Sequence, residues 1–285
     1  MLTTAQKIRL ARVASWVVVT GRRAVGKPSA GMFSRGGLTW QLDLKEGIDL
    51  SIFLLGGFER NAIAAYRRII KPGNVVVDAG ANIGAHTLPL AQLVGNDGRV
   101  LAFEPTAFAV SKFRANVAVN PELGRRITLH QVMLVSQDAD ALESLIYSSW
   151  PLTASSELHG THKGRLMGTE GARAVTLDSM VRLDDCPRVD FIKLDVDGHE
   201  VAVLRGARIT LERFRPIIAL ELAPYVHDEF GQRFEELIDL LRAHGYAFHH
   251  LTDDSILPAN AAALRKLVPR KGGLCVLARG NHTRA

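Results

Sequence analysis

A buried strand that runs into a glycine-rich turn constrains the fold of this chain more than any other feature. Residues 75–84 read VVVDAGANIG, and a second apolar strand that ends in an acid, LAFEP, follows at residues 101–105. Gly80 and Gly84 allow the backbone to approach a ligand closely and to turn sharply into a helix. Glu104 stands at the carboxyl end of the second strand, where it can accept hydrogen bonds from two vicinal ribose hydroxyls. This order of strand, turn, helix, strand and acid predicts a bound nucleoside.

The nucleoside is predicted to be S-adenosylmethionine (SAM) rather than NAD. Asn82 occupies the place of the second glycine in the dinucleotide fingerprint G-x-G-x-x-G. A pyrophosphate needs bare amides at a helix N-terminus, whereas SAM has no phosphate and tolerates a side chain there. An NAD-dependent oxidoreductase is the alternative, and it would bind NADH more tightly than S-adenosylhomocysteine. A glycine turn that only packs a strand on a helix is disfavoured by the presence of both Asp78 and Glu104.

Strand-like and helical segments alternate along the rest of the chain, which is typical of a parallel sheet covered on both faces by helices. We expect a Rossmann-like α/β fold with seven strands, preceded by an N-terminal extension of helix and strand. Because residues 253–271 carry no strong crossover helix, the last strand is expected to be antiparallel and to lie at one edge of the sheet. The expected strands are residues 75–79, 100–104, 127–134, 189–196, 217–222, 246–251 and 273–278, and the expected helices are residues 85–94, 107–120, 201–214 and 232–244.

Two regions lie outside this alternation, and they divide the chain. Residues 1–70 are expected to form a basic extension, in which alternating apolar side chains at 38–44 predict a strand before a helix at 60–70. Residues 71–285 form the predicted SAM-binding domain, with a polar insertion at 137–175. The insertion either shapes the pocket, as long loops at the carboxyl side of such sheets do, or is a surface loop. Its polar side chains include Ser148, Ser149, Ser155, Ser156, His159 and His162.

Positive charge is concentrated at the two ends of the chain. Residues 1–42 hold seven Lys or Arg and residues 255–285 hold six, with no Asp or Glu in either segment. The body between them has 22 basic and 29 acidic residues, so the net charge of +6 does not indicate nucleic-acid binding. Cys186 and Cys275 have no metal-binding spacing, which agrees with a reducing compartment, and a cytoplasmic location is expected.

The segment at residues 7–27 mixes basic side chains with an apolar run. This run is shorter than the roughly 20 residues that span a bilayer. A signal peptide would have a longer apolar core and a small-residue cleavage site. We therefore expect a helix that caps the fold, and peripheral membrane contact through this basic segment is the alternative.

A second set of polar residues follows a later strand. Residues 189–200, VDFIKLDVDGHE, read as a strand, an acidic turn and the start of a helix. Asp195 shares a strand face with Lys193 and emerges at the carboxyl end, where open parallel sheets bind ligands. Lys193 is expected to pair with Asp195 or another acid. His199 is the candidate catalytic base, because an imidazole can accept a proton near neutral pH.

The acids that follow Asp195 have simpler structural explanations than catalysis. Asp197 next to Gly198 is what a tight turn selects, and Glu200 is placed where a carboxylate stabilises the first turn of a helix. For the same reason we expect no metal, although four side chains could supply oxygen and imidazole ligands to Mg²⁺. They are Asp195, Asp197, His199 and Glu221.

The motifs together resemble the FkbM-type SAM-dependent methyltransferases, a family of the larger seven-stranded class. The resemblance rests on DAGANIG at residues 78–84, FEP at 103–105, TLDS at 176–179 and IKLDVDGHE at 192–200. It extends to GFE at 57–59 and to residues 216–221, and it covers the chain from about residue 38 to residue 251. Asp197 departs from the pattern, since many relatives carry Glu at this place.

The resemblance implies methyl transfer from SAM, usually to oxygen, on a sugar, a glycan or another small molecule, with S-adenosylhomocysteine as the second product. It also implies which residues would contact SAM: Gly80, Ala81, Asn82, Gly84, Glu104 and Pro105. Within this set Glu104 would hold the ribose. Asp78 would support the loop or the ammonium group of the ligand, and Asp195 would face the donor or the acceptor.

The reaction needs a base as well as a methyl donor. An alcohol is a poor nucleophile, and a base that removes its proton during methyl transfer contributes about 100-fold to 10,000-fold. We expect His199 to be this base, with Asp195 orienting it or binding the acceptor hydroxyl. An amine acceptor would need a similar base. A non-catalytic SAM-binding protein stays as an alternative, because a fold does not determine function.

Overall fold

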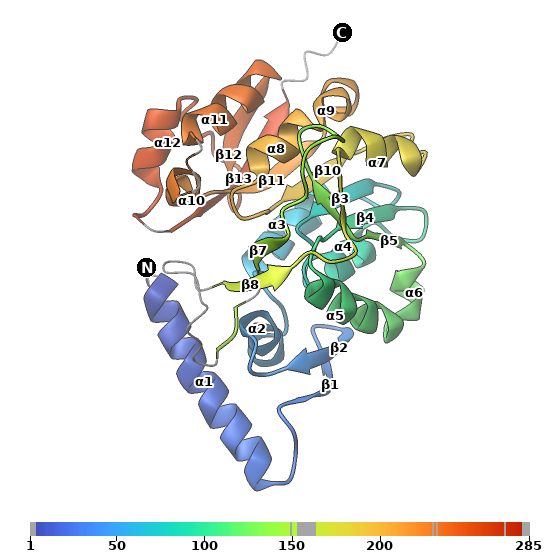
Figure 1. The fold of residues 1–285 in the computed structure, drawn as a ribbon, viewed down its shortest axis with the longest axis vertical. Helices are drawn as coiled ribbons and strands as arrows, with labels where there is room; N and C mark the ends of the chain where they lie inside the picture. The colour runs from blue at the N-terminus through green and yellow to red at the C-terminus, as the bar shows by residue number, and fades with distance from the viewer. Residues whose placement is uncertain are drawn as a thin grey trace.

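A seven-stranded sheet forms the centre of the protein in the computed structural model (Figure 1), which describes residues 4–148, 150–152, 164–229, 231, 233–270 and 272–280. The strand order is β12-β13-β11-β10-β3-β4-β5. These strands are β3 (Val75–Ala79), β4 (Arg99–Phe103), β5 (Ile127–His130), β10 (Phe191–Leu194), β11 (Ile217–Leu222), β12 (Tyr246–His250) and β13 (Leu274–Gly280). The sheet confirms the predicted α/β class.

The direction of the strands confirms one prediction and corrects another. The pairs β10·β11, β10·β3, β3·β4 and β4·β5 are parallel, whereas β13 is antiparallel to both β11 and β12. The reversed last strand was therefore predicted correctly, but it lies second from the edge and β12 is the edge strand. The segment between them contains a helix that was not expected, α12 (Ala261–Leu267), and β13 then returns between β12 and β11.

Helices cover both faces of the sheet because successive side chains of each strand point to opposite sides. Val77 packs in the apolar cluster that includes α7, α8, α9, α11 and α12, while Val76 packs in the cluster that includes α3 and α4. The bounds of these and the neighbouring helices are α3 (Arg60–Ile69), α4 (Thr87–Leu93), α5 (Ala107–Ala118), α6 (Pro121–Gly124), α7 (Leu177–Leu183), α8 (Glu200–Arg205), α9 (Arg208–Phe214), α10 (Pro224–Glu229) and α11 (Phe234–Ala243). The predicted cover on both faces is confirmed.

The helix expected at residues 201–214 is two helices, α8 and α9, which meet at Gly206. A Cβ atom at Gly206 would lie 2.1 Å from the carbonyl oxygen of Val135, so this position packs directly against a neighbouring backbone. The carbonyl oxygen of Gly206 accepts a hydrogen bond from the amide of Asp178 at 2.9 Å. The Thr210 amide, which would donate to this carbonyl in a continuous helix, donates instead to Asp178 Oδ1 at 2.8 Å, and this explains the break.

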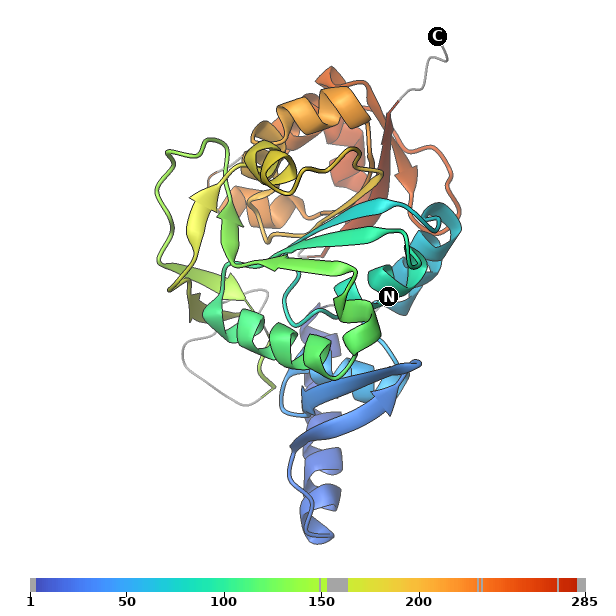
Figure 2. The ribbon, with the colours of Figure 1, turned by 90° about the vertical axis from the view of Figure 1, so that its right-hand side faces the viewer.

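The N-terminal elements lie at one end of the molecule, where α1 and the β1–β2 hairpin project from the body (blue in Figures 1 and 2). They are α1 (Thr4–Ala24), β1 (Ala30–Arg35), β2 (Leu38–Asp43) and α2 (Gly47–Leu55), of which α2 was not predicted. The predicted alternation of apolar side chains in this strand is confirmed, since Trp40 and Leu42 of β2 are buried and Gln41 between them is exposed. Their apolar cluster also includes Ile83 and Leu88 from the region after β3. The division of the chain at residue 70 stays a prediction.

Among the described residues, no helix is both long enough and apolar enough to cross a membrane.

The described part of the predicted insertion forms two small strand pairs. β6 (Val132–Leu134) pairs in parallel with β9 (Arg173–Val175), and β7 (Leu145–Ser148) forms an antiparallel hairpin with β8 (Arg165–Gly168). The strand predicted at residues 127–134 is therefore two strands, of which only β5 belongs to the central sheet. Ser149, Ser155, Ser156, His159 and His162 lie outside the described residues.

Candidate functional site

The glycine turn after β3 and the acidic turn after β10 lie side by side because these two strands are parallel neighbours. Gly80 has φ of 80°, and a Cβ atom there would lie 1.8 Å from the carbonyl oxygen of Asp195. From the sequence, glycine at position 80 was expected to leave room for a ligand. In the structure, the backbone of Asp195 already leaves no room for a side chain at this position. Gly80 also lines the cavity described below, so one residue joins both turns to the site.

Glu104 holds two loops together at the carboxyl end of β4. Its side chain is buried, with Oε2 accepting a hydrogen bond from the Asn82 amide at 3.0 Å and Oε1 accepting from the Thr106 amide at 2.9 Å. The Thr106 hydroxyl donates to Oε1 as well. Burial raises the pKa of Glu104 above its ordinary value, and these hydrogen bonds oppose that shift. The carboxylate therefore organises the glycine turn in addition to lining the cavity.

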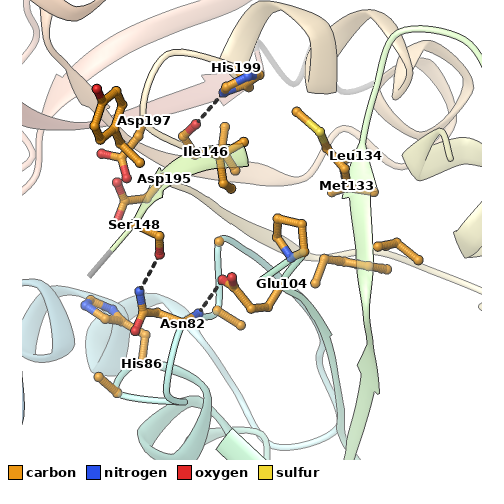
Figure 3. Close-up of a pocket in the computed structure, with 18 of the residues that line it drawn as sticks. Asn82, His86, Glu104, Met133, Leu134, Ile146, Ser148, Asp195, Asp197 and His199 are labelled. Atoms are coloured by element: carbon orange, nitrogen blue, oxygen red, sulfur yellow. Dashed lines mark hydrogen bonds between the residues drawn. The ribbon is translucent and has the colours of Figure 1, made fainter. Parts of the chain in front are cut away.

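Asn82 connects the glycine turn to the insertion. Its φ of 48° lies in the left-handed region, which asparagine tolerates better than most residues, and its Oδ1 accepts a hydrogen bond from the Ile83 amide. Its Nδ2 donates to the Ser148 hydroxyl at 3.3 Å, so that Asn82 lies between Glu104 and Ser148 (Figure 3). The side chain that replaces the fingerprint glycine thus has structural partners on both sides.

Lys193 is buried at the site, and it pairs with Asp195 as predicted. Its Nζ lies 3.2 Å from Asp195 Oδ2 and 3.4 Å from Asp78 Oδ1, and it donates to the Gly80 carbonyl oxygen at 2.9 Å. Burial alone would lower the pKa of Lys193, but the two carboxylates raise it above its ordinary value. Asp78 also accepts from the Thr87 hydroxyl at 2.6 Å and does not line the cavity, so its contacts support the loop.

The acidic turn has the structural features that the sequence predicted. Asp197 and Gly198 have φ of 47° and 100°, and Glu200 Oε1 accepts from the amides of Val196 and Gly198 at 3.3 Å. Asp197 is exposed to solvent, although protein atoms crowd its carboxylate. Partial loss of hydration, followed by the nearby charges of Asp195 and Glu200, raises the pKa of Asp197 to about 8.

His199 is held by a carbonyl on one side and a carboxylate on the other. Its Nδ1 lies 3.1 Å from the Val196 carbonyl oxygen, and its Nε2 lies 3.0 Å from Glu143 Oε1. A carbonyl oxygen only accepts, so Nδ1 carries a proton, and the neutral ring has its lone pair at Nε2. Because the Glu143 carboxylate also only accepts, the contact at Nε2 suits the ring after it has taken up a second proton. Glu143 would then stabilise the imidazolium. Glu143, rather than Asp195, is the carboxylate beside Nε2.

One cavity brings these residues together, and Figure 3 shows His199 and His86 on opposite walls of it. Of the predicted site residues, those that line it are Gly80, Ala81, Asn82, Glu104, Pro105, Asp195 and His199. Asp78 and Gly84 do not line it. The described part of the insertion contributes lining residues from β7, which favours the first of the two alternatives for this part.

Several lining residues were missed by the sequence analysis. His86 is buried beside Asn82, and its Nε2 lies 3.2 Å from Glu59 Oε2. Phe58 and Trp150 form an aromatic wall, with ring centroids 6.2 Å apart. The GFE motif drew attention to Phe58 and Glu59, but nothing in the spacing indicated that Glu143 or His86 would reach the same cavity.

In the described ranges, no group of three or more His, Cys, Asp or Glu side chains is arranged to hold a metal ion.

A smaller cavity beside the first is lined by Glu221, which was predicted only as a possible metal ligand. The Glu221 side chain is exposed to solvent, although protein atoms crowd its carboxylate. Loss of hydration, followed by the nearby charges of Asp195 and Glu59, raises the pKa of Glu221 to about 8. Its carboxylate is therefore harder to ionise in the folded state than in the unfolded chain.

This shift predicts a pH dependence of stability. The folded state holds the Glu221 proton up to about pH 8, whereas the unfolded chain releases it near the ordinary value of 4.5. Stability should therefore fall as pH rises between these values. Glu221→Gln should raise Tm above that of the parent at pH 8 to 9, with the difference vanishing at acidic pH. Parallel Tm curves for the two proteins across that range would contradict the assignment.

Known methyltransferases are similar to this chain over the segment that contains both turns of the site. The model of the methyltransferase FkbM domain matches residues 78–248. The hexuronic acid methyltransferase AglP of Haloferax volcanii is 28% identical over 160 residues, covering 56% of this chain and 61% of that protein. The 31-O-demethyl-FK506 methyltransferase FkbM of Streptomyces tacrolimicus is 29% identical over 203 residues, covering 62% of this chain and 74% of that protein.

Solved structures of methyltransferases are similar at lower identity. The crystal structure of a methyltransferase FkbM from Methylobacillus flagellatus is 19% identical with a TM-score of 0.43, covering 76% of this chain and 50% of that one. The alignment with AglP spans about three fifths of that relative's length.

Proposed function

The chain belongs to the FkbM methyltransferase family, and from this premise we propose that it transfers the methyl group of SAM to a hydroxyl oxygen of a sugar, a glycan or a hydroxylated metabolite. The family match favours methyl transfer over the NAD-dependent oxidation that the sequence left open. The donor, the acceptor atom and the acceptor class are the proposed parts of this function.

The observation that carries the proposal is the position of Glu104 beside the glycine turn. Its carboxylate lies at the carboxyl end of β4 and lines the cavity together with Gly80 and Asn82. A carboxylate in this place suits two vicinal ribose hydroxyls. A pyrophosphate would need free amides at a helix N-terminus. Here the Asn82 amide is already bonded to Glu104, and α4 begins only at Thr87.

The residues of the cavity have distinct parts in the proposed reaction. SAM supplies a methyl group on an electrophilic sulfonium, and the protein aligns an acceptor oxygen with it. Asp195, held in place by Lys193, presents a carboxylate oxygen for the acceptor hydroxyl. As the acceptor oxygen takes the methyl group and the S–CH₃ bond breaks to leave S-adenosylhomocysteine, the hydroxyl proton would pass to Nε2 of His199. Glu143 stabilises the resulting positive charge at 3.0 Å.

The lining of the cavity supports an acceptor that has hydroxyl groups and an apolar surface. Asp195, Ser148 and His199 offer hydrogen bonds, while Phe58 and Trp150 offer flat apolar faces. A sugar ring presents both kinds of surface. The two relatives named above act, by their names, on a hexuronic acid and on demethyl-FK506. We therefore propose a glycan or small-molecule acceptor.

Glu104→Gln is predicted to weaken S-adenosylhomocysteine binding by about 1.5 to 3 kcal/mol, or roughly 10-fold to 150-fold. The neutral amide cannot accept two hydrogen bonds at each end, and its NH₂ group would face an amide donor of Asn82 or Thr106. Calorimetric titration with S-adenosylhomocysteine measures the change, and NADH is the control ligand.

Binding of S-adenosylhomocysteine alone by the parent would support the cofactor assignment. Binding of NADH alone would overturn it, as would unchanged affinity of the Glu104→Gln protein. Because Glu104 also holds the Asn82 and Thr106 amides, circular dichroism and Tm of the variant should be recorded with the titration. A folded variant with weakened binding separates the ligand contact from the structural one.

A further inference from the structure

The N-terminal helix α1 has an apolar face that no described residue covers. Its inner side packs on the body through Val19, and the Ser15 hydroxyl donates to the Leu44 carbonyl oxygen at 2.7 Å. On the opposite side, four large side chains are 55% to 68% exposed. These four residues, which we call the outer face, are Leu10, Val13, Trp16 and Val17.

The spacing of these residues makes the outer face continuous. Leu10, Val13 and Val17 follow one another at intervals of three and four residues, which places them on one side of a helix. Arg9, Trp16 and Arg23 are spaced by seven residues, so they form a line along the border of that apolar stripe. Both arginines are exposed. The apolar stripe of the outer face is thus bordered by Arg9, Trp16 and Arg23.

The charge of α1 and of the residues that follow it, up to residue 42, is of one sign. Residues 1–42 contain seven Lys or Arg and no acid, while the 29 acidic residues all lie in the body of the chain. In Figures 1 and 2, α1 runs along the end of the molecule that the N-terminal elements form, away from the central sheet. An apolar stripe with basic and aromatic residues at its border suits the boundary between anionic headgroups and acyl chains.

We propose that the outer face of α1 binds the surface of an anionic lipid bilayer. The helix lies in the plane of the interface, with the stripe of Leu10, Val13 and Val17 in the acyl boundary and Trp16 at the level of the headgroups. Arg9 and Arg23 contact lipid phosphates. The helix rests on the membrane and does not span it, in keeping with its composition.

A second copy of the chain fits this face less well than a membrane. In a symmetric dimer the same patch meets itself, so Arg9 and Arg23 of one protomer would approach those of its partner. No acid in residues 1–42 could offset this repulsion. Anionic lipid supplies the missing negative charge.

The test is co-sedimentation of the full chain with extruded vesicles. Vesicles of phosphatidylcholine mixed equally with phosphatidylglycerol should bind the protein at least about tenfold more tightly than phosphatidylcholine alone, and added salt should weaken this binding. The double variant Val13→Ser/Val17→Ser should lose about tenfold or more of the binding. Leu183→Ser is the matched control, because Leu183 is 64% exposed on another helix, and it should bind as the parent does.

Each outcome decides the proposal. Equal binding to both vesicle types, or no binding to either, would overturn it. So would a double variant that sediments like the parent. Analytical ultracentrifugation of the same proteins without lipid tests the competing explanation. If the parent is a dimer that the double variant splits into monomers, the outer face is a contact between copies and the membrane proposal fails.

Discussion

His199→Ala should lower kcat/KM for methyl transfer by about 100-fold to 10,000-fold, the contribution expected of a general base. The loss should appear in kcat, since the imidazole accepts the proton only as the acceptor oxygen attacks. S-adenosylhomocysteine affinity should stay close to that of the parent, because the predicted ribose contact is made by Glu104. Labelled SAM, with an acceptor identified by screening sugars and hydroxylated metabolites, provides the rate.

Two further variants separate the base from its surroundings. Glu143→Gln removes the charge beside Nε2 at 3.0 Å but leaves the imidazole, so its effect on kcat should be smaller than that of His199→Ala. His86→Ala removes the other histidine of the same cavity, which lies against Glu59. If His86→Ala abolished turnover and His199→Ala did not, the base would be His86.

Gly80→Ala should destabilise the protein by about 3 kcal/mol or more. The left-handed backbone conformation destabilises a residue that has a side chain by about 1 to 2 kcal/mol relative to glycine. In addition, the added Cβ atom would lie 1.8 Å from the Asp195 carbonyl oxygen. Relief of that overlap requires β3 and β10 to shift, which typically costs a further 1 to 3 kcal/mol, roughly the penalty of overpacking. Urea unfolding followed by circular dichroism measures the loss, and S-adenosylhomocysteine binding should fall with it.

Gly73→Ala is the matched control for this substitution. Gly73 has φ of 85°, close to that of Gly80, but nothing lies within 4 Å of the position that its Cβ would take. The control therefore measures the backbone strain without the overlap. Equal destabilisation by the two substitutions would mean that contact with the Asp195 backbone does not constrain the site.

Much of the fold was predictable because its determinants are local. The apolar runs of β3, β4 and β11 and the alternation in β2 lie within short windows, and a strand pattern of this kind depends on neighbouring residues alone. Local sequence patterns were less informative where tertiary contacts determine the end of a helix or the order of the strands. The helix at 201–214 breaks where the Thr210 amide bonds to Asp178 and Gly206 packs on the Val135 backbone. Likewise, β13 inserts between β12 and β11 by pairing with both.

The sequence by itself determined the class of fold, the turn at Gly80, the acid at the end of β4 and the acid at the end of β10. These follow from strand length, side-chain alternation and the conformational needs of single residues. Only the tertiary structure decided which groups face each other. Glu143 reaches His199 across 56 positions of sequence, and Glu59 reaches His86. Loss of hydration, followed by the neighbouring carboxylates, raises the pKa of Asp197 and of Glu221. Such contacts join segments that are distant along the chain, and their distances are set by the packing of the whole sheet rather than by any local pattern.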